Sequence, residues 1–218
     1  DASELNEYWI NHKNIFSESY FAPLIYFASE ASDEITNKTI NNKEKYETLY
    51  GESSINTMII FLIYGKFDRA IEAKSKSKFE EAKQYAEKAI DNKESLKNII
   101  FNSEVDFLKA QNKWNQVFES YKKLKENGEM DHGYINHFSW QVYRDCKDTI
   151  TRFSLIYKEV IKKCVDWMRE VTEKEPTYQY LDTYAYLLYK SGDLKETKII
   201  ANLALKAAKK EGESTKSL

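Results

Sequence analysis

Apolar residues recur at steps of three and four along almost the whole chain, and this spacing predicts α-helices. The clearest examples are the apolar run Met58–Tyr64, inside a long helix expected over 54–73, and an alanine stripe in a helix expected over 79–90. Small residues on one stripe let neighbouring helices approach closely. The same spacing predicts further helices over 91–108, 114–127, 134–143, 149–173, 181–191 and 194–208.

Turn residues divide these helices into successive pairs. Asn112 and three glycines directly follow periodic segments, where a residue with left-handed backbone commonly ends a helix. Asp91 and Glu94 have the spacing of a capping box, so a helix is expected to begin at Asp91. The three glycines are Gly51, Gly128 and Gly192.

The first 53 residues are less regular. Pro23 interrupts a helical pattern, which predicts either a helix break near Ala22 or a helix that begins there. The polar stretch 32–42 is expected to be a connector. We therefore divide the chain into an N-terminal helical segment (1–53), a block of helix pairs (54–210) and a frayed tail (211–218).

Composition agrees with a folded, all-α protein. Apolar residues make up 42% and charged residues 31% of the chain, which favours a folded globular protein over a disordered one. Six Gly and two Pro are too few for a protein rich in tight hairpins. Basic and acidic residues are spread evenly along the chain and give a net charge of -2, so no nucleic-acid partner is expected. The longest apolar run is far shorter than the roughly 20 residues of a membrane-spanning helix, so no transmembrane segment is expected.

The helix pairs repeat at a period close to that of tetratricopeptide (TPR) units, which is about 34 residues. The best copy surrounds Gly192, with the small residues Ala201 and Ala204 at the packing positions of its second helix. Thr197 stands where the family usually has alanine. The resemblance implies three or four antiparallel helix pairs stacked as a short right-handed TPR-like solenoid after an irregular N-terminal segment.

A narrower resemblance covers about 37–218. The segments 46–51, 136–140, 165–167 and 180–192 resemble the C-terminal helical extension of thioredoxin-like envelope proteins of Bacteroidetes-type bacteria. That resemblance implies an accessory role beside a thiol-disulfide domain and an extracytoplasmic (periplasm or envelope) location, although a cytoplasmic one stays open. No Cys-x-x-Cys motif occurs, so no redox residue is transferred, and residues 1–35 have no counterpart.

Candidate chemistry is sparse. His132 and His137 lie five apart, beside Asp131, and only a loose metal site is conceivable there. Cys146 and Cys164 are expected to be buried, with a disulfide as the alternative. No nucleophile motif or phosphate-binding loop is present. We therefore predict no catalytic residues, no metal and no cofactor.

These patterns predict a non-enzymatic protein-protein interaction or scaffolding module. Stacked helix pairs form a concave surface lined by their first helices, which suits a protein or peptide partner. The alternatives are a helical-bundle enzyme or small-ligand-binding domain with a pocket not visible in sequence, a nucleic-acid adaptor, and a purely architectural domain. The expected exposed groove positions are Asn98, Asn102, Asn136, His137, Tyr180 and Thr183.

Overall fold

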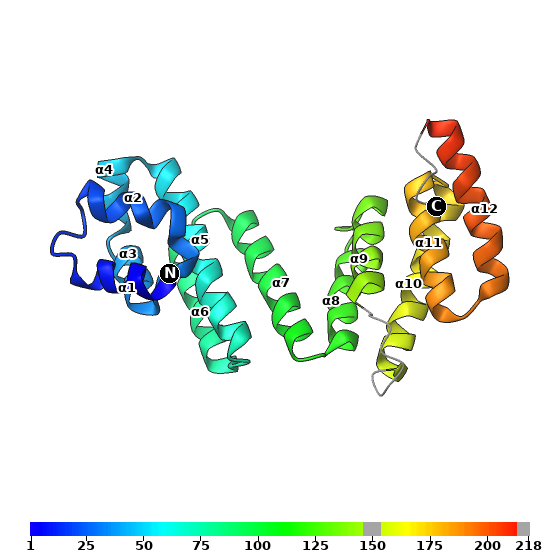
Figure 1. The fold of residues 1–218 in the computed structure, drawn as a ribbon, viewed down its shortest axis with the longest axis horizontal. Helices are drawn as coiled ribbons and strands as arrows, with labels where there is room; N and C mark the ends of the chain where they lie inside the picture. Colours follow the sequence, from blue (N-terminus) through cyan, green and yellow to red (C-terminus); the bar gives the residue numbers. More distant parts are fainter. Residues whose placement is uncertain (146–153, 213–218) are drawn as a thin grey trace. The chain divides into compact units, whose positions relative to one another are not determined.

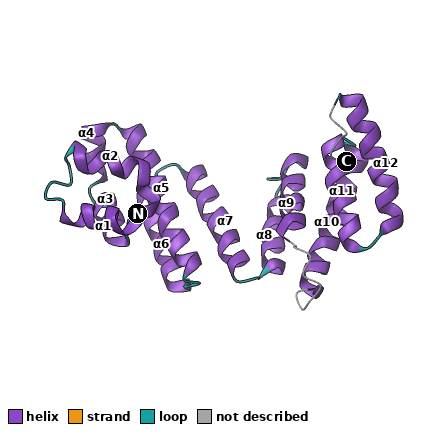
Figure 2. Cartoon of the chain, viewed as in Figure 1, coloured by secondary structure: helices purple, strands orange, loops and turns teal. Residues whose placement is uncertain are grey.

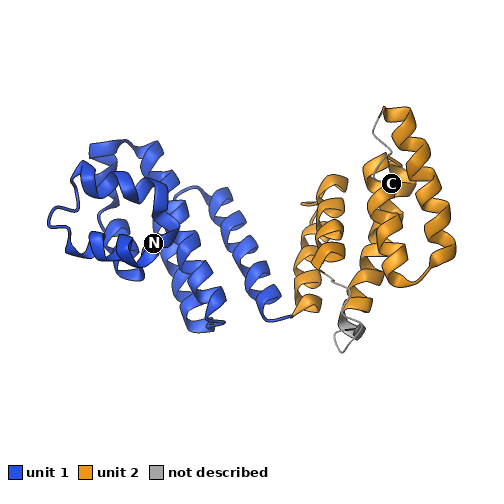
Figure 3. Cartoon of the chain, viewed as in Figure 1, with its two compact units in different colours: residues 1–112 blue, residues 113–218 orange. Residues whose placement is uncertain are grey.

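The computed structural model describes residues 1–145 and 154–212, and within this part of the chain the protein is all-helical (Figures 1 and 2). Helices account for 84% of the residues, and the described ranges contain no strand. The all-α prediction is therefore confirmed. The chain forms two compact units, residues 1–112 (unit 1) and 113–218 (unit 2), coloured separately in Figure 3.

Unit 1 is built around one long helix, α5. This helix packs against each of the helices α2, α3, α4, α6 and α7 and against the 3₁₀ turn η1. Most of its buried positions are apolar, which explains why the longest apolar run of the sequence lies here, and the charged Lys66 is buried among them. The elements of unit 1 are α1 (Ala2–Asn11), α2 (Glu18–Phe27), η1 (Ala28–Glu30), α3 (Asp33–Ile40), α4 (Lys43–Tyr50), α5 (Glu52–Glu72), α6 (Lys76–Ala89) and α7 (Lys93–Ala110).

The expected break at Pro23 does not occur, because α2 continues from Glu18 to Phe27. Proline lacks the N–H that would bond the carbonyl of Ser19 four residues earlier. That carbonyl instead accepts a hydrogen bond of 2.7 Å from the hydroxyl of Tyr8 on α1. A tertiary contact thus replaces the bond that proline removes, and the helix tolerates it.

The polar stretch 32–42 is a helix and not the expected connector. Ser32 caps α3 by accepting from the backbone N–H of Ile35. Four of the eight residues of α3, among them Ile35 and Ile40, are buried. This segment has few apolar residues at helical spacing, and its packing against α1 and α5 explains why it nevertheless forms a helix.

Unit 2 is built around α11, which packs against α9, α10 and α12. Aromatic rings fill its core: the Phe138 ring stacks on Tyr121 with centroids 3.9 Å apart, and Phe118 lies 4.4 Å from Trp167. Gly192 has a φ of +89° and ends α11, as predicted. The elements are α8 (Trp114–Glu126), α9 (His132–Asp145), α10 (Ser154–Lys174), α11 (Tyr178–Ser191) and α12 (Leu194–Glu211).

The boundary between the two units falls between residues 112 and 113, inside the predicted repeat block 54–210. The division into 1–53, 54–210 and 211–218 rests on repeats and not on compactness, so it stays a prediction. Cys164 is buried within α10, and Cys146 lies outside the described residues. The alternative of a disulfide between them therefore also stays open.

Candidate functional site

The six predicted groove residues fall in both units. Asn98 and Asn102 are exposed one turn apart on α7 of unit 1. The other four belong to unit 2, with Asn136 and His137 on α9, and Tyr180 and Thr183 on α11. Because α9 packs against α11, the structure brings these four onto neighbouring helices. The candidate site is therefore built from unit 2 alone.

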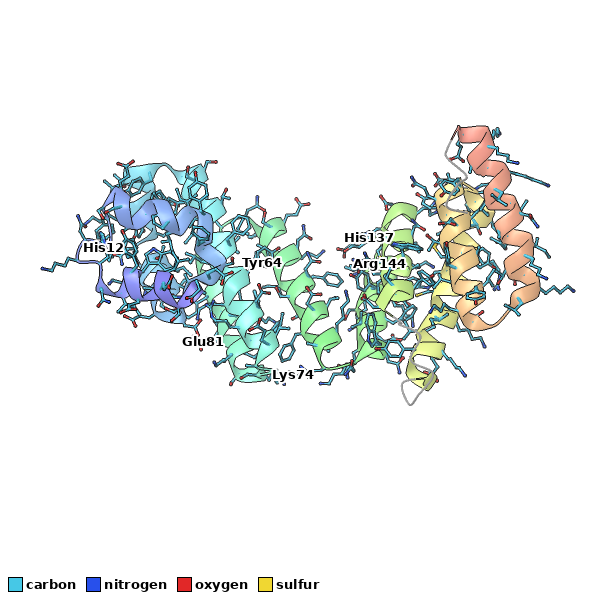
Figure 4. The ribbon with its side chains drawn as sticks, viewed as in Figure 1. His12, Tyr64, Lys74, Glu81, His137 and Arg144 are labelled. Carbon is cyan, nitrogen blue, oxygen red and sulfur yellow. The ribbon has the colours of Figure 1, made fainter. Side chains whose placement is uncertain are left out.

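The four residues differ in what they offer a ligand. His137 is exposed on α9, two turns before Arg144 (Figure 4), and its Nε2 lies 2.8 Å from Nε2 of Gln141. Asn136 is half-buried. Thr183 is 4% exposed, and its hydroxyl donates to the Gln179 carbonyl at 3.2 Å. The expectation that Thr183 is exposed is wrong, because its side chain faces the packed side of α11.

Tyr180 is half-buried at the beginning of α11. Burial raises the pKa of its hydroxyl, and the nearby carboxylates of Glu175 and Asp131 raise it further. His132 Nδ1 lies 2.9 Å from Glu175 Oε2. Within 1–145 and 154–212, no group of three or more His, Cys, Asp or Glu side chains is placed to hold a metal ion.

Three half-buried aromatic rings lie together where α9 meets α11. Trp140 and Tyr143 come from α9, with ring centroids 5.0 Å apart. Tyr186 comes from α11, and its centroid is 5.6 Å from that of Trp140 and 4.9 Å from that of Tyr143. The groove residues predicted from the sequence include none of these three rings. Trp140 stands four residues after Asn136, and Tyr186 stands four residues after Asp182, which was the available signal that these two rings share a helix face with polar residues.

Asp182 is the acidic member of this region, on α11 and one turn before Tyr186. Burial raises the pKa of its carboxyl group above the ordinary 3.8. The spacing of four residues places Asp182 and Tyr186 on the same face of α11. Burial raises the pKa of the Tyr186 hydroxyl, and the charge of Asp182 raises it further. Among the described residues, no hydrogen-bond donor or cation pairs with the Asp182 carboxylate. An ionised group is thus half-buried without compensation.

We call Asn136, Trp140, Tyr143, Asp182 and Tyr186 the aromatic surface. It combines flat π faces with polar oxygens. The Oδ1 atom of Asn136 is buried and has no hydrogen-bond partner in the described part of unit 2. The half-buried rings and the half-buried Asp182 carboxylate are the groups of this surface that can receive a ligand, through apolar contact and hydrogen-bond donors respectively.

A cleft lies on a different side of α11. Helices α10, α11 and α12 enclose a cleft of about 410 Å³ with mainly apolar walls that include Leu181, Ile200 and Leu203. At one end, the Tyr184 hydroxyl donates to Glu196 Oε1 at 2.8 Å and accepts from Arg169 Nε at 3.1 Å. This network is internally paired, which is typical of a structural group.

The Tyr184 hydroxyl at this end of the cleft is not a general base. Burial raises the pKa of Tyr184 to about 12, and the hydrogen bond to Glu196 contributes. Such a hydroxyl does not act as a base near neutral pH. Arg169 is held by Asp166 at 3.1 Å as well as by Tyr184.

Comparison with known proteins gives no assignment. No protein-family model matches the chain, and searches of curated proteins and of solved structures find no match. In the described residues, no helix combines the length and the apolar character needed to cross a membrane. The aromatic surface and the cleft are consequently interpreted from their own chemistry.

The carboxylate of Asp182 leads to a first prediction about the stability of the folded protein. We expect Asp182→Asn to raise the free energy of unfolding at pH 7 by on the order of 0.5 kcal/mol. Because the folded-state pKa is raised, the ionised carboxylate destabilises the folded protein. Stability is therefore lost as the pH rises from 3.8 through the folded-state pKa.

Urea unfolding at several pH values tests this expectation. The gain from Asp182→Asn should be present at pH 7 and should vanish below about pH 3.8, where Asp182 is protonated in both states. Glu173→Gln, at an exposed position on α10, removes the same charge and serves as the control. A loss of stability in Asp182→Asn at pH 7 would show that Asp182 has a stabilising partner.

Proposed function

We propose that this chain is a non-enzymatic protein-interaction module and that unit 2 binds a segment of a partner protein across the aromatic surface. The observation that carries this proposal is the trio Trp140, Tyr143 and Tyr186, whose centroids lie 4.9–5.6 Å apart while each ring stays partly accessible. Tryptophan and tyrosine dominate binding energy at protein interfaces, because rigid rings bury much area at little entropic cost.

The arrangement of the helices supports a repeat architecture for unit 2. The contacts Trp140–Tyr186 and Tyr143–Tyr186, together with the packing of α9 on α11, fit two neighbouring first helices. Helices α10 and α12 would then be the second helices, and the left-handed Gly192 would be the turn residue. In a TPR-like stack, the aromatic surface would line the concave side. The further role beside a thioredoxin-like domain and the extracytoplasmic location are proposed from sequence resemblance.

A second candidate function is binding of a small apolar ligand in the cleft between α10, α11 and α12. Its volume of about 410 Å³ falls within the usual range of ligand pockets, roughly 300–1,000 Å³. Apolar walls with one polar end suit a ligand of mixed character. If this function is correct, a ligand bound in the cleft should stabilise the protein against unfolding even when Trp140 or Tyr186 is replaced. Peptide binding at the aromatic surface should instead depend on both residues.

Selection from a displayed library of random 12-residue peptides tests the main proposal. We expect enriched peptides to bind Trp140→Ala and Tyr186→Ala at least tenfold more weakly than the unchanged protein, as for central aromatic residues of interfaces. Tyr26→Ala is the matched control, because Tyr26 lies on α2 in unit 1 and is 81% exposed. Circular dichroism establishes that each variant is folded.

Two results would contradict the proposal. One is a failure to enrich any peptide over a protein that carries both Trp140→Ala and Tyr186→Ala. The other is enrichment of peptides that bind these variants as well as they bind the unchanged protein. In the second case, peptide binding would be located elsewhere on the chain.

A further inference from the structure

We infer that the aromatic surface recognises an arginine side chain of the bound segment, with the guanidinium held between the carboxylate of Asp182 and the ring faces of Tyr186 and Trp140. This inference rests on the proposed function, because it names the chemistry of the ligand that the same surface receives. It depends on three features: a charge without a partner, adjacent π faces, and the distance to the nearest cation on α11.

The first feature is the Asp182 carboxylate. It is half-buried, and within the described ranges no side chain or backbone donor compensates its charge. Burying an ionised group without a partner costs free energy that a ligand cation can recover. A positively charged group is therefore the complement that this position lacks.

The second feature is the pair of rings beside that carboxylate. Tyr186 lies one turn after Asp182 on the same face of α11, and the Trp140 ring meets it edge-on at 5.6 Å. Cations bind favourably over aromatic faces, and tryptophan gives the strongest attraction. A cation near Asp182 would thus contact carboxylate and π faces together.

Arginine fits these groups better than lysine does. Its guanidinium is planar, stacks on aromatic rings and can donate two parallel hydrogen bonds to one carboxylate. It is also more weakly hydrated than an ammonium group, so it is more readily transferred to a half-buried site. The lysine ammonium lacks the planar geometry that both contacts use.

The third feature is the position of Lys190. Its Nζ lies 5.5 Å from the centroid of the Tyr143 ring, so this region already places a cation over one aromatic face. Lys190 follows Asp182 by eight residues, which is about 12 Å along a helix axis. It is accordingly not the partner of Asp182, and an arginine can bind at the Asp182 end beside it.

The test compares arginine with citrulline, its neutral analogue of the same shape. A labelled peptide from the library selection is synthesised with arginine, citrulline or lysine at the same position, and binding is measured by fluorescence anisotropy. With the unchanged protein, we expect citrulline to weaken binding about tenfold and lysine to weaken it less. With Asp182→Asn, the arginine and citrulline peptides should bind within about twofold of each other. Glu173→Gln is the charge-matched control and should preserve the tenfold difference.

The possible failures are distinguishable. If peptides bind, lose affinity in Trp140→Ala and yet contain no arginine or tolerate citrulline, the inference is wrong and the proposed function stands. If citrulline weakens binding equally in Asp182→Asn and in the unchanged protein, the arginine binds elsewhere and the inference is again wrong. If no peptide binds through the aromatic surface, the proposed function fails, and the inference fails with it.

Discussion

Replacing Gly65 with alanine is expected to destabilise unit 1 by about 3 kcal/mol or more. Gly65 lies in the middle of α5, where that helix crosses η1. A Cβ atom at this position would overlap the carbonyl oxygen of Ser29 and would lie 2.9 Å from its carbonyl carbon and 3.0 Å from its Cα. These atoms belong to the backbone, so no side-chain rotation relieves the overlap and the two elements must separate.

Gly133→Ala is the matched control for this effect. Gly133 is also in a helix, but its added Cβ would meet only Asp131 Oδ1 at 3.4 Å and the Tyr180 hydroxyl at 3.8 Å. The expected change is between zero and a gain of about 0.5 kcal/mol, because alanine favours the helix. Chemical denaturation followed by circular dichroism measures both variants. A loss below about 1 kcal/mol for Gly65→Ala would show that α5 and η1 are not so closely packed.

Removal of the two carboxylates around Lys66 is expected to produce the second large effect. The Lys66 side chain on α5 is 3% exposed, and its Nζ lies 3.1 Å from Asp33 Oδ1 and 3.2 Å from Glu81 Oε1. It also lies 4.5 Å from the centroid of the Tyr85 ring. The double variant Asp33→Asn and Glu81→Gln leaves a buried ammonium without a counter-charge, which typically costs about 3–5 kcal/mol.

Lys66→Met in the same background should restore most of this stability, because it removes the uncompensated charge and keeps the volume. Lys66→Met alone should cost much less than the double variant, since Asp33 keeps a 2.8 Å bond to Arg69 and the carboxylates are 45% and 48% exposed. Equal losses in the double and triple variants would mean that the charge on Lys66 is not the cause.

Asp33 also gives this cluster a pH dependence. Burial acts to raise the pKa of Asp33, but the hydrogen bonds and charges of Arg69 and Lys66 outweigh it and hold the pKa below the ordinary 3.8. The stability that Asp33 contributes is therefore complete above pH 3.8 and is lost as the pH falls through the folded-state pKa. Asp33→Asn should reduce the acid sensitivity of unit 1 in urea unfolding below that pH.

Helix periodicity and turn residues predicted most of the individual helices. The long helix expected over 54–73 is α5 (Glu52–Glu72), and the turns expected at Asn112 and Gly192 have positive φ values of 58° and 89°. These features depend on residues close in sequence, such as an apolar stripe or a residue that tolerates left-handed backbone. Local patterns carry that information directly.

The elements that differ from expectation depend on residues distant in sequence. Pro23 is accommodated through the hydroxyl of Tyr8. The expected cap at Asp91 is displaced by one residue: Asn92 accepts from the Ser95 backbone N–H, while Asp91 pairs with Lys43 at 2.6 Å. A single sequence shows which residues can cap a helix but not which of them a distant lysine engages.

The candidate site was only partly predictable for the same reason. Asn136, His137 and Tyr180 were predicted as groove positions from the expected repeat, and they lie on α9 and α11 of unit 2. Trp140, Tyr143, Tyr186 and Asp182 come together only when α9 packs against α11, because Trp140 and Tyr186 are 46 positions apart in the sequence. Sequence alone does not show which aromatic rings of a helix pair stay half-buried.

The most direct test of the central claim is an NMR titration that follows the indole N–H signals of the four tryptophans. Trp9, Trp114 and Trp167 are at most 7% exposed, whereas Trp140 is half-buried in the aromatic surface. When a selected peptide is added, the Trp140 signal should shift most, and Trp140→Phe identifies it. Saturable binding that leaves the Trp140 signal in place would contradict the assignment of the aromatic surface as the binding site.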